Sequence, residues 1–340
     1  ISKGIVSGIV KASESIRSER MPDFIPDQGA DLRTPSSWRI IVLPDTQCYV
    51  DQNKAEANER HFHRQTQWIV ERKEADNIRY VLHTGDMTQH NIPSEWAKAR
   101  KIMSELNGHV PYLVIPGNHD LGPGGNAYDR STLMAGYFPI SDARKYTGYA
   151  GSFQEDDPAN VYHLLDAGEV DWLIIGLEFG PRDAVLRWAK GLVEKHPRHS
   201  IILVTHAYLY DDDTRFDFKT KGITQAGNPQ YYHIMALPGY ANDGEQIWKG
   251  VVSNTKKASI VVCGHVLGDG LGYRCEKNVG GENVAQMLVN FQQRNEGGEG
   301  YLRILEFSKD SRTIRVMDYS PSLDRFLPGG QSQFLIELRR

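Results

Sequence analysis

The stretch that most constrains the fold runs from Leu113 to Asp120, where the apolar residues Leu-Val-Ile give way to Pro-Gly-Asn-His-Asp. An apolar run that stops at Pro and Gly predicts a buried strand ending in a tight loop. This loop places an amide, an imidazole and a carboxylate side by side, at Asn118, His119 and Asp120. Asn and His are metal ligands, but Gly, Asn and Asp also favour ordinary turns. The stretch alone leaves both interpretations open.

Similar apolar runs recur along the chain, and helical patterns separate them. The runs lie at 39–43, 78–83, 200–205 and 258–263, and the helical patterns at about 53–74, 94–106, 183–196 and 245–253. Strands that alternate with helices predict βαβ units and a layered α/β fold. Ligand sites in such sheets lie beyond the carboxyl ends of the strands. We therefore expect the polar residues at these ends, among them Asp45, Asp86 and Asn118, to converge.

The rest of the chain predicts a hairpin, a C-terminal antiparallel set and two long insertions. The hairpin pattern covers 161–165 and 172–177, and the antiparallel set covers 285–291, 301–307, 313–319 and 333–338. Residues 1–37 are expected to form an N-terminal arm or linker, since 20–37 are rich in Pro, Asp, Arg and Ser. Residues 38–340 would then form one domain. Its insertions at about 121–160 and 207–244 are expected to be functional loops.

Composition limits the possible partners. The chain has 340 residues, of which 40% are hydrophobic, enough for a sizeable core. A net charge of -4 without basic clusters argues against nucleic acid as a partner. We expect no membrane span, because no apolar run approaches the roughly 20 residues required. Three cysteines exclude a disulfide framework but not one bridge.

The chain begins at Ile1 rather than Met. Removal of a signal peptide on export to the periplasm or outside the cell would explain this start, and so would trimming of the chain. The compartment and the oligomeric state therefore stay open.

Five strand ends carry polar residues in a particular order. They are Asp45 with Gln47, Asp86, Asn118 with His119, His206, and His265. This order of Asp-x-Gln, Gly-Asp, Gly-Asn-His-Asp, His and Gly-His resembles the calcineurin-like metallophosphoesterases over residues 38–307. Leu-Pro-Asp-Thr-Gln at 43–47 is similar to a bacterial subgroup of that superfamily. The resemblance implies a four-layer α/β/β/α sandwich with two mixed sheets. It also implies hydrolysis of a phosphate monoester or diester, on a small molecule or a glycan, by water activated at a dinuclear metal centre.

The resemblance also implies a role for each residue. Asp86 would bridge the two metal ions, because like-charged cations need an anion between them. Asn118, His206 and His265 would complete the second site, and Asp45 and Gln47 would hold the first ion. His119 would hydrogen-bond the phosphate or protonate the leaving oxygen, and Asp120 would orient its ring.

Two positions depart from the family pattern, and both belong to the first metal site. The family usually has His where this chain has Gln47 and Leu267. The first site would keep only the oxygen donors of Asp45, Gln47 and Asp86, which suit Mn²⁺, Mg²⁺ or Ca²⁺ better than Zn²⁺ or Fe. We therefore expect a firmly held second ion and a weaker first one. Asp269 could replace the missing imidazole, or it could be an ordinary loop residue.

Residues that would contact the substrate are less well defined. Arg182 could bind a phosphate through its planar guanidinium or form a structural salt bridge. Tyr208 lies in the second insertion with three more tyrosines, Tyr210, Tyr231 and Tyr232. These four rings could form a wall for a ring-shaped leaving group, or they could pack on one another. Two rival functions remain. One is a catalytically impaired binding or scaffolding protein on the same fold, and the less favoured one is a nuclease.

Overall fold

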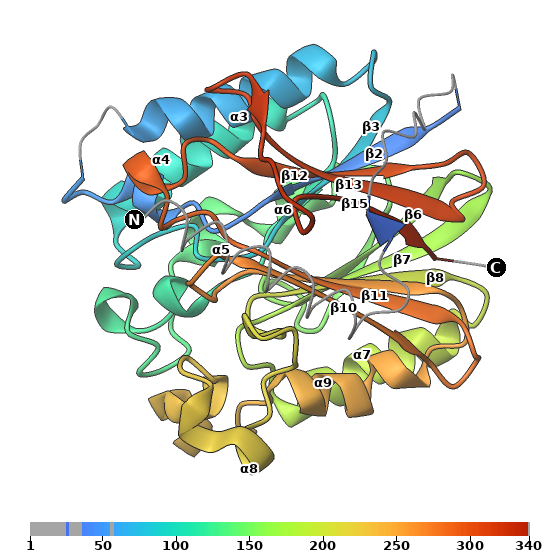
Figure 1. Ribbon diagram of the computed structural model, residues 1–340. Coiled ribbons are helices and arrows are strands. Elements are labelled where there is room, and N and C mark those ends of the chain that lie inside the picture. Colours follow the sequence, from blue (N-terminus) through green and yellow to red (C-terminus); the bar gives the residue numbers. More distant parts are fainter. Residues whose placement is uncertain (1–24, 27–35, 55–57, 339–340) are drawn as a thin grey trace, which may run out of the picture.

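Two mixed β-sheets face each other in the computed structural model, and helices cover their outer faces (Figure 1). The expected four-layer α/β/β/α sandwich is therefore confirmed. The structure describes residues 25–26, 36–54 and 58–338. Most of the arm expected at 1–37 lies outside these residues, but β1 (Ile25–Pro26) pairs with β15 (Gln333–Glu337) at the edge of the first sheet.

The first sheet has the order β1-β15-β13-β12-β2-β3-β4, and β14 pairs with β13. Strands β2, β3 and β4, at one end of this order, are parallel and almost wholly buried, as their apolar runs predict. Helices α3 and α4 pack on its outer face through a shared apolar cluster. The elements are β2 (Trp38–Leu43), α3 (Glu59–Arg72), β3 (Ile78–His83), α4 (Pro93–Met103), β4 (Tyr112–Leu113), β12 (Leu302–Phe307), β13 (Thr313–Ser320) and β14 (Arg325–Phe326).

The second sheet has the order β10-β11-β9-β8-β7-β6-β5. Its outer face is covered by α7 and α9 (Figure 1). The expected hairpin is present, because β6 and β7 pair antiparallel across a turn at Gly168 and Glu169 with positive φ at both residues. The elements are β5 (Tyr149–Ser152), β6 (Val161–Ala167), β7 (Val170–Leu177), α7 (Asp183–Lys195), β8 (Ser200–Thr205), α9 (Gly244–Gly250), β9 (Ser259–Cys263), β10 (Leu271–Lys277) and β11 (Asn283–Val289).

The expectation of a purely antiparallel C-terminal set is wrong at β11. This strand runs parallel to β9 and antiparallel to β10, a strand that the sequence pattern did not predict. After β9 the chain passes along the edge as β10 and returns as β11 between the two, so β11 has the direction of β9. The carboxyl end of β11 therefore joins the other parallel strand ends.

The two insertions contain more regular structure than expected. Residues 121–160 include α5 (Met134–Tyr137), α6 (Ile140–Ala143) and β5, and residues 207–244 include α8 (Phe218–Lys221). The remaining short helix is α2 (Gln47–Val50), and short 3₁₀ turns cover Ser104–Leu106, Asn118–Asp120, Pro123–Gly125, Gly222–Thr224, Pro229–Tyr231, His233–Ala236, Val252–Asn254 and Asn295–Gly297. In the described part of the chain, no helix is long and apolar enough to cross a membrane.

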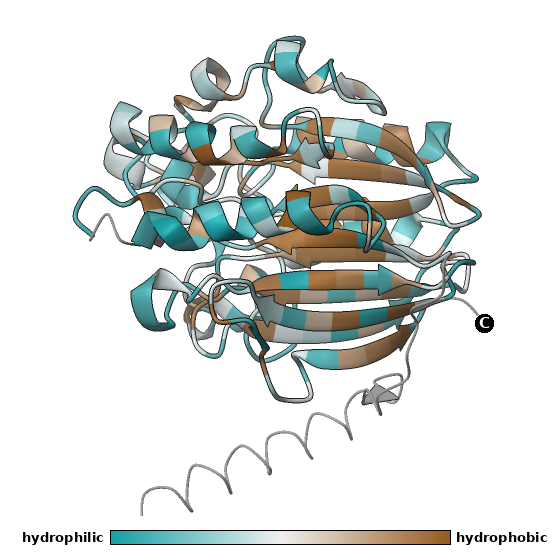
Figure 2. Ribbon diagram, turned by 90° about the horizontal axis from the view of Figure 1, so that it is seen from above, coloured by the Kyte–Doolittle hydropathy of each residue, from teal (hydrophilic) through white to brown (hydrophobic). Residues whose placement is uncertain are grey.

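Apolar residues concentrate on the strands, and hydrophilic residues occupy the outer helix surfaces (Figure 2). Between the sheets, the Trp38 ring stacks on Phe307 at 4.0 Å and meets Trp172 edge-on at 6.0 Å. The buried Arg303 forms a two-point ion pair with Asp318 within the first sheet, both contacts at 2.8 Å, and donates to the Leu288 carbonyl of the second sheet at 3.3 Å. This packing fixes the two sheets relative to each other, and so fixes any site that both sheets build.

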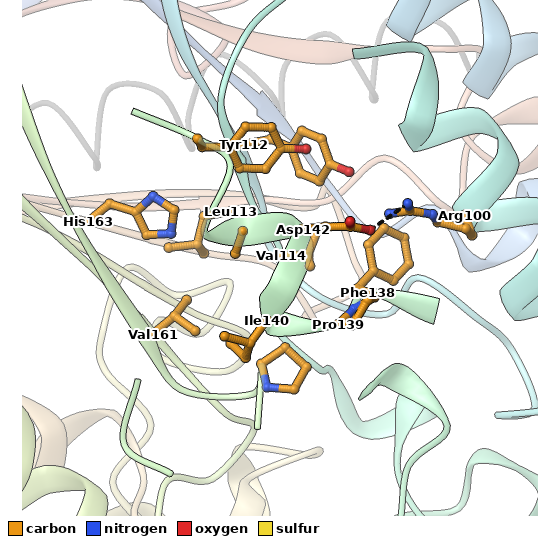
Figure 3. Close-up of a pocket in the computed structure, with 13 residues that line it drawn as sticks. Arg100, Tyr112, Leu113, Val114, Phe138, Pro139, Ile140, Asp142, Val161 and His163 are labelled. Carbon is orange, nitrogen blue, oxygen red and sulfur yellow. Dashed lines mark hydrogen bonds and ion pairs between the residues drawn. The ribbon is translucent and has the colours of Figure 1, made fainter. Parts of the chain in front are cut away.

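A separate small pocket of about 30 Å³ lies where β4 approaches β6 (Figure 3). Apolar side chains line it, including Leu113, Ile140 and Val161, and the Arg100–Asp142 ion pair at 2.6 Å lies on one side. A larger pocket, of about 420 Å³, lies at the carboxyl ends of the parallel strands, and it shares no lining residue with the small one.

Candidate metal centre

The polar residues that follow the parallel strands of both sheets meet at one place. Asp86 follows β3 of the first sheet, and His206 and His265 follow β8 and β9 of the second. One ligand atom from each of these three residues lies within 4.8 Å of the others. Asn118 joins them, with its Oδ1 3.1 Å from His206 Nε2. A pocket of about 420 Å³ opens over this group.

The carboxylate of Asp86 lies at the centre of the group. Its Oδ1 accepts a hydrogen bond from the His119 backbone N–H at 2.9 Å, and its Oδ2 lies 3.2 Å from His206 Nε2. Burial alone would raise the pKa of Asp86, but the nearby His206 and His119 outweigh burial and lower it. The backbone of Asp86 has φ of 51°, an unfavourable conformation for a non-glycine residue that is typical of functional sites. A side chain at Gly117 would overlap the Asp86 carboxylate.

His206 is held in a defined tautomer. Its Nδ1 donates to the Thr84 carbonyl at 2.8 Å, so in the neutral ring Nε2 carries no proton and can bind a metal ion. Burial alone would lower the pKa of His206, but the carboxylates of Asp86 and Asp45 raise it to about 9. The fully buried ring therefore lies in a strongly negative environment, as a cation-binding site requires.

In His265 the two ring nitrogens have the opposite roles from those in His206. Its Nε2 donates to the Gly227 carbonyl at 2.8 Å, which leaves Nδ1 without a proton in the neutral ring. Burial and the nearby His206 lower the pKa of His265 to about 3, so the ring is neutral. The residue has φ of 74°, a second strained backbone position at this site.

Asp45 is fixed by hydrogen bonds from the second sheet. Its Oδ2 accepts hydrogen bonds from the His265 backbone N–H and from Asn290 Nδ2, both at 2.9 Å. Burial raises the pKa of Asp45 to about 7, with a further rise from Asp86 that opposes the lowering by His206. The sequence analysis missed Asn290. Asn290 directly follows β11, which was expected to belong to an antiparallel set. Because β11 in fact runs parallel to β9, its carboxyl end lies at the site.

Gln47 is the first residue of the short helix α2, two positions after Asp45. Its Nε2 donates to Asp86 Oδ2 at 3.1 Å and to Gln292 Oε1 at 2.7 Å. Its Oε1 is buried and has no hydrogen-bond partner within the described residues. A buried acceptor without a partner is unfavourable by about 1–3 kcal/mol, and a bound cation would satisfy it. The donor set of carboxylates, amides and imidazoles fits divalent metal ions.

The His119 ring lies in the pocket, but Asp120 does not orient it as expected. His119 Nδ1 lies 3.0 Å from the Gln89 carbonyl, which leaves Nε2 available to a ligand. The Asp120 carboxylate instead accepts hydrogen bonds from Gly117, Met87 and Thr88 at 2.8–3.0 Å. The 3₁₀ turn directs Asp120 back to the backbone, where it ties the Asn118–Asp120 turn to the segment after β3.

The sequence pattern of the calcineurin-like phosphoesterases matches residues 39–269, more than half of the chain. The chain belongs to the calcineurin-like phosphoesterase family. It is 27% identical over 314 residues to the uncharacterized protein YvnB of Bacillus subtilis (strain 168). The match covers 92% of this chain but only 22% of YvnB, so the chain spans about a fifth of that protein.

The fold is similar to that of a solved phosphatase. The purple acid phosphatase PPD1 from yellow lupin (Lupinus luteus) superposes with a TM-score of 0.50 and 15% sequence identity. The similar region covers 89% of this chain and 54% of the lupin chain. At this identity the likeness concerns the fold alone, and it agrees with the family's two-sheet architecture.

Gln47 and Leu267, the two departures from the family pattern, lie in different surroundings. Gln47 contacts the Asp86 carboxylate, whereas Leu267 lines the pocket with 45% of its surface exposed and offers no ligand atom. Asp269 Oδ1 accepts a hydrogen bond from the Leu271 N–H at 3.1 Å, which is a loop role. Asp269 is not among the residues that line the pocket.

Arg182 and Tyr208, which were expected to contact the substrate, do not line this pocket. Arg182 forms a two-point ion pair with Glu178, at 2.8 Å and 3.0 Å, outside the pocket. Tyr208 is fully buried, and its hydroxyl donates to Gln286 at 2.9 Å. The path of the chain after β8 turns Tyr208 into the core, while Tyr210 and Tyr232 line the pocket.

A second, more open pocket of about 390 Å³ adjoins the first. Ala226, Gly227 and Tyr232 line both pockets, and Ile223 and Tyr231 line only the second. Ile223 is 85% exposed, a large apolar side chain left in solvent beside the site. The insertion after β8 thus provides an apolar surface next to the polar strand ends.

Proposed function

We propose that this chain is a metal-dependent phosphoesterase that hydrolyses a phosphate monoester or diester on a small molecule or a glycan. The observation that carries the proposal is the meeting of Asp86, His206 and His265 at the base of an open pocket that His119 also lines. Family membership supports the same reaction class. We also assign the chain to the bacterial subgroup with Leu-Pro-Asp-Thr-Gln at 43–47.

The strand ends would hold two divalent ions. The second site would use Asp86, Asn118, His206 and His265, a mixed nitrogen and oxygen set suited to Mn²⁺, Fe or Zn²⁺. The first would use Asp45, Gln47 and Asp86, whose oxygen donors suit Mn²⁺, Mg²⁺ or Ca²⁺ and bind more weakly. When bound, such ions supply charge that polarises a phosphate and lowers the pKa of water.

His119 would serve the leaving group. In the doubly protonated ring, Nδ1 can donate to the Gln89 carbonyl at 3.0 Å, and Nε2 can then give its proton to a leaving oxygen or donate a hydrogen bond to a phosphate. Asp120 would act at a distance from the reaction, because its hydrogen bonds fix the turn that presents Asn118 and His119. His119 is therefore the proposed catalytic residue, and Asp120 is a positioning residue.

The pocket lining favours substrates with little negative charge beyond the reacting phosphate. Among the described residues, the lining holds Asp86 and Asp211 but no lysine or arginine. The charge of a phosphate would have to be balanced by the metal ions. The adjoining apolar pocket, with Tyr231 and Ile223, would accommodate a ring-shaped leaving group such as an aryl group or the apolar face of a sugar.

A binding or scaffolding protein is the second candidate, and the exposed Leu267 in place of a ligand supports it. The nuclease is disfavoured by the net charge of -4 and by the absence of cationic side chains from the described pocket lining.

An assay separates these functions. Purified full chain is given an aryl phosphate or an aryl phosphodiester, each with added Mn²⁺ or with a chelator. The proposal expects turnover of at least one ester with Mn²⁺ and loss of turnover with the chelator. Absence of turnover with Mn²⁺, Mg²⁺, Fe²⁺ and Zn²⁺ would favour the binding protein, and cleavage of single-stranded DNA in preference to both esters would favour the nuclease.

A further inference from the structure

Gln292 is the feature of the site that the family pattern does not explain. We propose that Gln292 is a ligand of the first metal ion and supplies, together with Gln47, the amide oxygens that stand in for the absent imidazoles. The inference rests on the proposed function, since it concerns the metal centre of the same pocket. It identifies a residue about 25 positions beyond Leu267, on a different strand end, as the replacement.

The contacts of Gln292 place it at the first site. Its Oε1 lies 2.7 Å from Gln47 Nε2, and that nitrogen lies 3.1 Å from Asp86 Oδ2. Two amides and the central carboxylate therefore gather around one point. Gln292 also lines the same pocket as Asp86, so an ion arriving from solvent can reach it.

The backbone that carries Gln292 is fixed against Asp45. The Gln292 N–H donates to Asn290 Oδ1 at 2.9 Å, and Asn290 Nδ2 donates to Asp45 Oδ2 at 2.9 Å. The end of β11 is thereby tied to the end of β2. Asp45, Gln47, Asp86 and Gln292 then surround the same side of the site, and each is positioned by the carboxyl end of a strand.

The Gln47 amide can turn either its nitrogen or its oxygen toward Asp86 and Gln292. The Gln47 amide donates to both neighbouring oxygens, and this leaves its own Oε1 buried and without a partner within the described chain. A half-turn of that amide exchanges its oxygen and nitrogen. Three oxygens, from Gln47, Asp86 and Gln292, would then face one another, an arrangement that is favourable only around a cation.

Neighbouring residues do not offer an equivalent donor. Leu267 carries no ligand atom, and the Asp269 carboxylate is engaged with the Leu271 N–H. Gln293, the next residue after Gln292, is exposed to solvent and does not line the pocket. The adjacent glutamines therefore provide a matched pair, in which only one faces the site.

The test uses the full chain, stripped of metal, and Mn²⁺ as the probe. Equilibrium dialysis with element analysis counts bound ions, and electron paramagnetic resonance reports whether two Mn²⁺ ions are coupled. The variants are Gln292→Leu, which removes the amide, Gln292→Glu, which keeps an oxygen donor and adds charge, and Gln293→Leu as the control. Circular dichroism and thermal unfolding verify that each variant folds.

We expect two ions in the wild type and in Gln293→Leu, with a coupled resonance signal. Gln292→Leu should weaken the first-site ion by about ten-fold or more, abolish the coupling at moderate Mn²⁺, and leave the second ion unchanged. Gln292→Glu should retain both ions. These results would support the inference even if no ester were hydrolysed, in which case only the proposed function would fall.

Wild-type affinity for both ions in Gln292→Leu would overturn the inference and leave the proposed function standing. Loss of both ions from a folded Gln292→Leu would also overturn it, because the second site would then depend on Gln292. Should Gln292→Leu fail to fold, loss of the first ion in Gln292→Glu would overturn it and retention of both ions would support it.

Discussion

The Nε2 atom of His206 lies 3.2 Å from the carboxylate of Asp86, although the two residues follow strands of different sheets. Both side chains are fully or almost fully buried, at 0% and 2% exposure. The site therefore depends on how the two sheets pack, and the aromatic residues between the sheets help to fix that packing. Removal of either partner changes both metal binding and the stability of the metal-free protein.

His206→Ala should destabilise the metal-free protein by about 3–5 kcal/mol, because it leaves the buried Asp86 carboxylate without its charged partner. Urea unfolding in the presence of a chelator measures the change. The same variant should lose the second metal ion. An unchanged urea midpoint would contradict this prediction, because it would show that the Asp86 carboxylate does not depend on His206 for its charge partner.

His119→Ala should keep both metal ions and reduce turnover by about 10²–10⁴-fold, because Nε2 would no longer serve the leaving oxygen. The reduction should be smaller for an ester with a better leaving group, which needs less protonation. His109→Ala, at an exposed histidine in a loop, is the control and should retain full turnover. Loss of metal from a folded His119→Ala protein would contradict the assigned role.

Gly117→Ala should destabilise the protein by about 1–3 kcal/mol, because the new methyl group would overlap the Asp86 carboxylate and backbone. Metal affinity should fall as well, since Asp86 must move. Gly191→Ala is the control, in which the same substitution is expected to raise stability instead of lowering it. It lies in α7 with open space around it, and alanine there should stabilise the helix by about 0.5–1 kcal/mol. Equal unfolding free energies for the two variants would contradict this account.

Stability should fall below about pH 6.5 because of His163, which is away from the metal centre and lines the small pocket of Figure 3. Its Nδ1 lies 2.7 Å from the Tyr80 hydroxyl, and burial lowers its pKa from 6.5 to about 3. The unfolded chain binds this proton more readily than the folded one. Stability from His163 is therefore present above pH 6.5 and is lost as the pH falls toward 3.

Unfolding free energies between about pH 7.5 and about pH 5 measure this effect in metal-free protein. His163→Gln should reduce the slope by up to about 1.4 kcal/mol per pH unit in the acidic part of the range. His109→Gln, at the exposed site, should leave the slope unchanged. Identical slopes for all three proteins would show that His163 is protonated without penalty in the fold.

The strand ends could be predicted because their signal is local. Near-continuous apolar runs mark the buried parallel strands β2, β3 and β8. These strands end one to three residues before Asp45, Asp86 and His206. The handedness and layering of α/β units then bring these ends to one edge. The order of the motifs along the chain is therefore enough to predict that Asp86, His206 and His265 meet.

The contacts that could not be predicted depend on pairing and loop conformation. Asn290 was missed as a site residue because only the β10–β11 hairpin gives β11 the direction of β9. Tyr208 and Tyr210 are two residues apart, and only the path of the chain after β8 decides which one faces the pocket. The hydrogen bonds of Asp120 could not be predicted because they come from three backbone N–H groups and the Thr88 hydroxyl, which no sequence motif identifies.

The most direct test of the central claim measures bound Mn²⁺ and ester hydrolysis on the same samples of the full chain as Mn²⁺ is added. Occupation of the second site, which binds first, should give little turnover, and turnover should rise with the weaker ion at Asp45, Gln47 and Asp86. Hydrolysis that persists in metal-stripped protein with a chelator would contradict the account. So would a protein that holds two ions and hydrolyses neither the aryl phosphate nor the aryl phosphodiester.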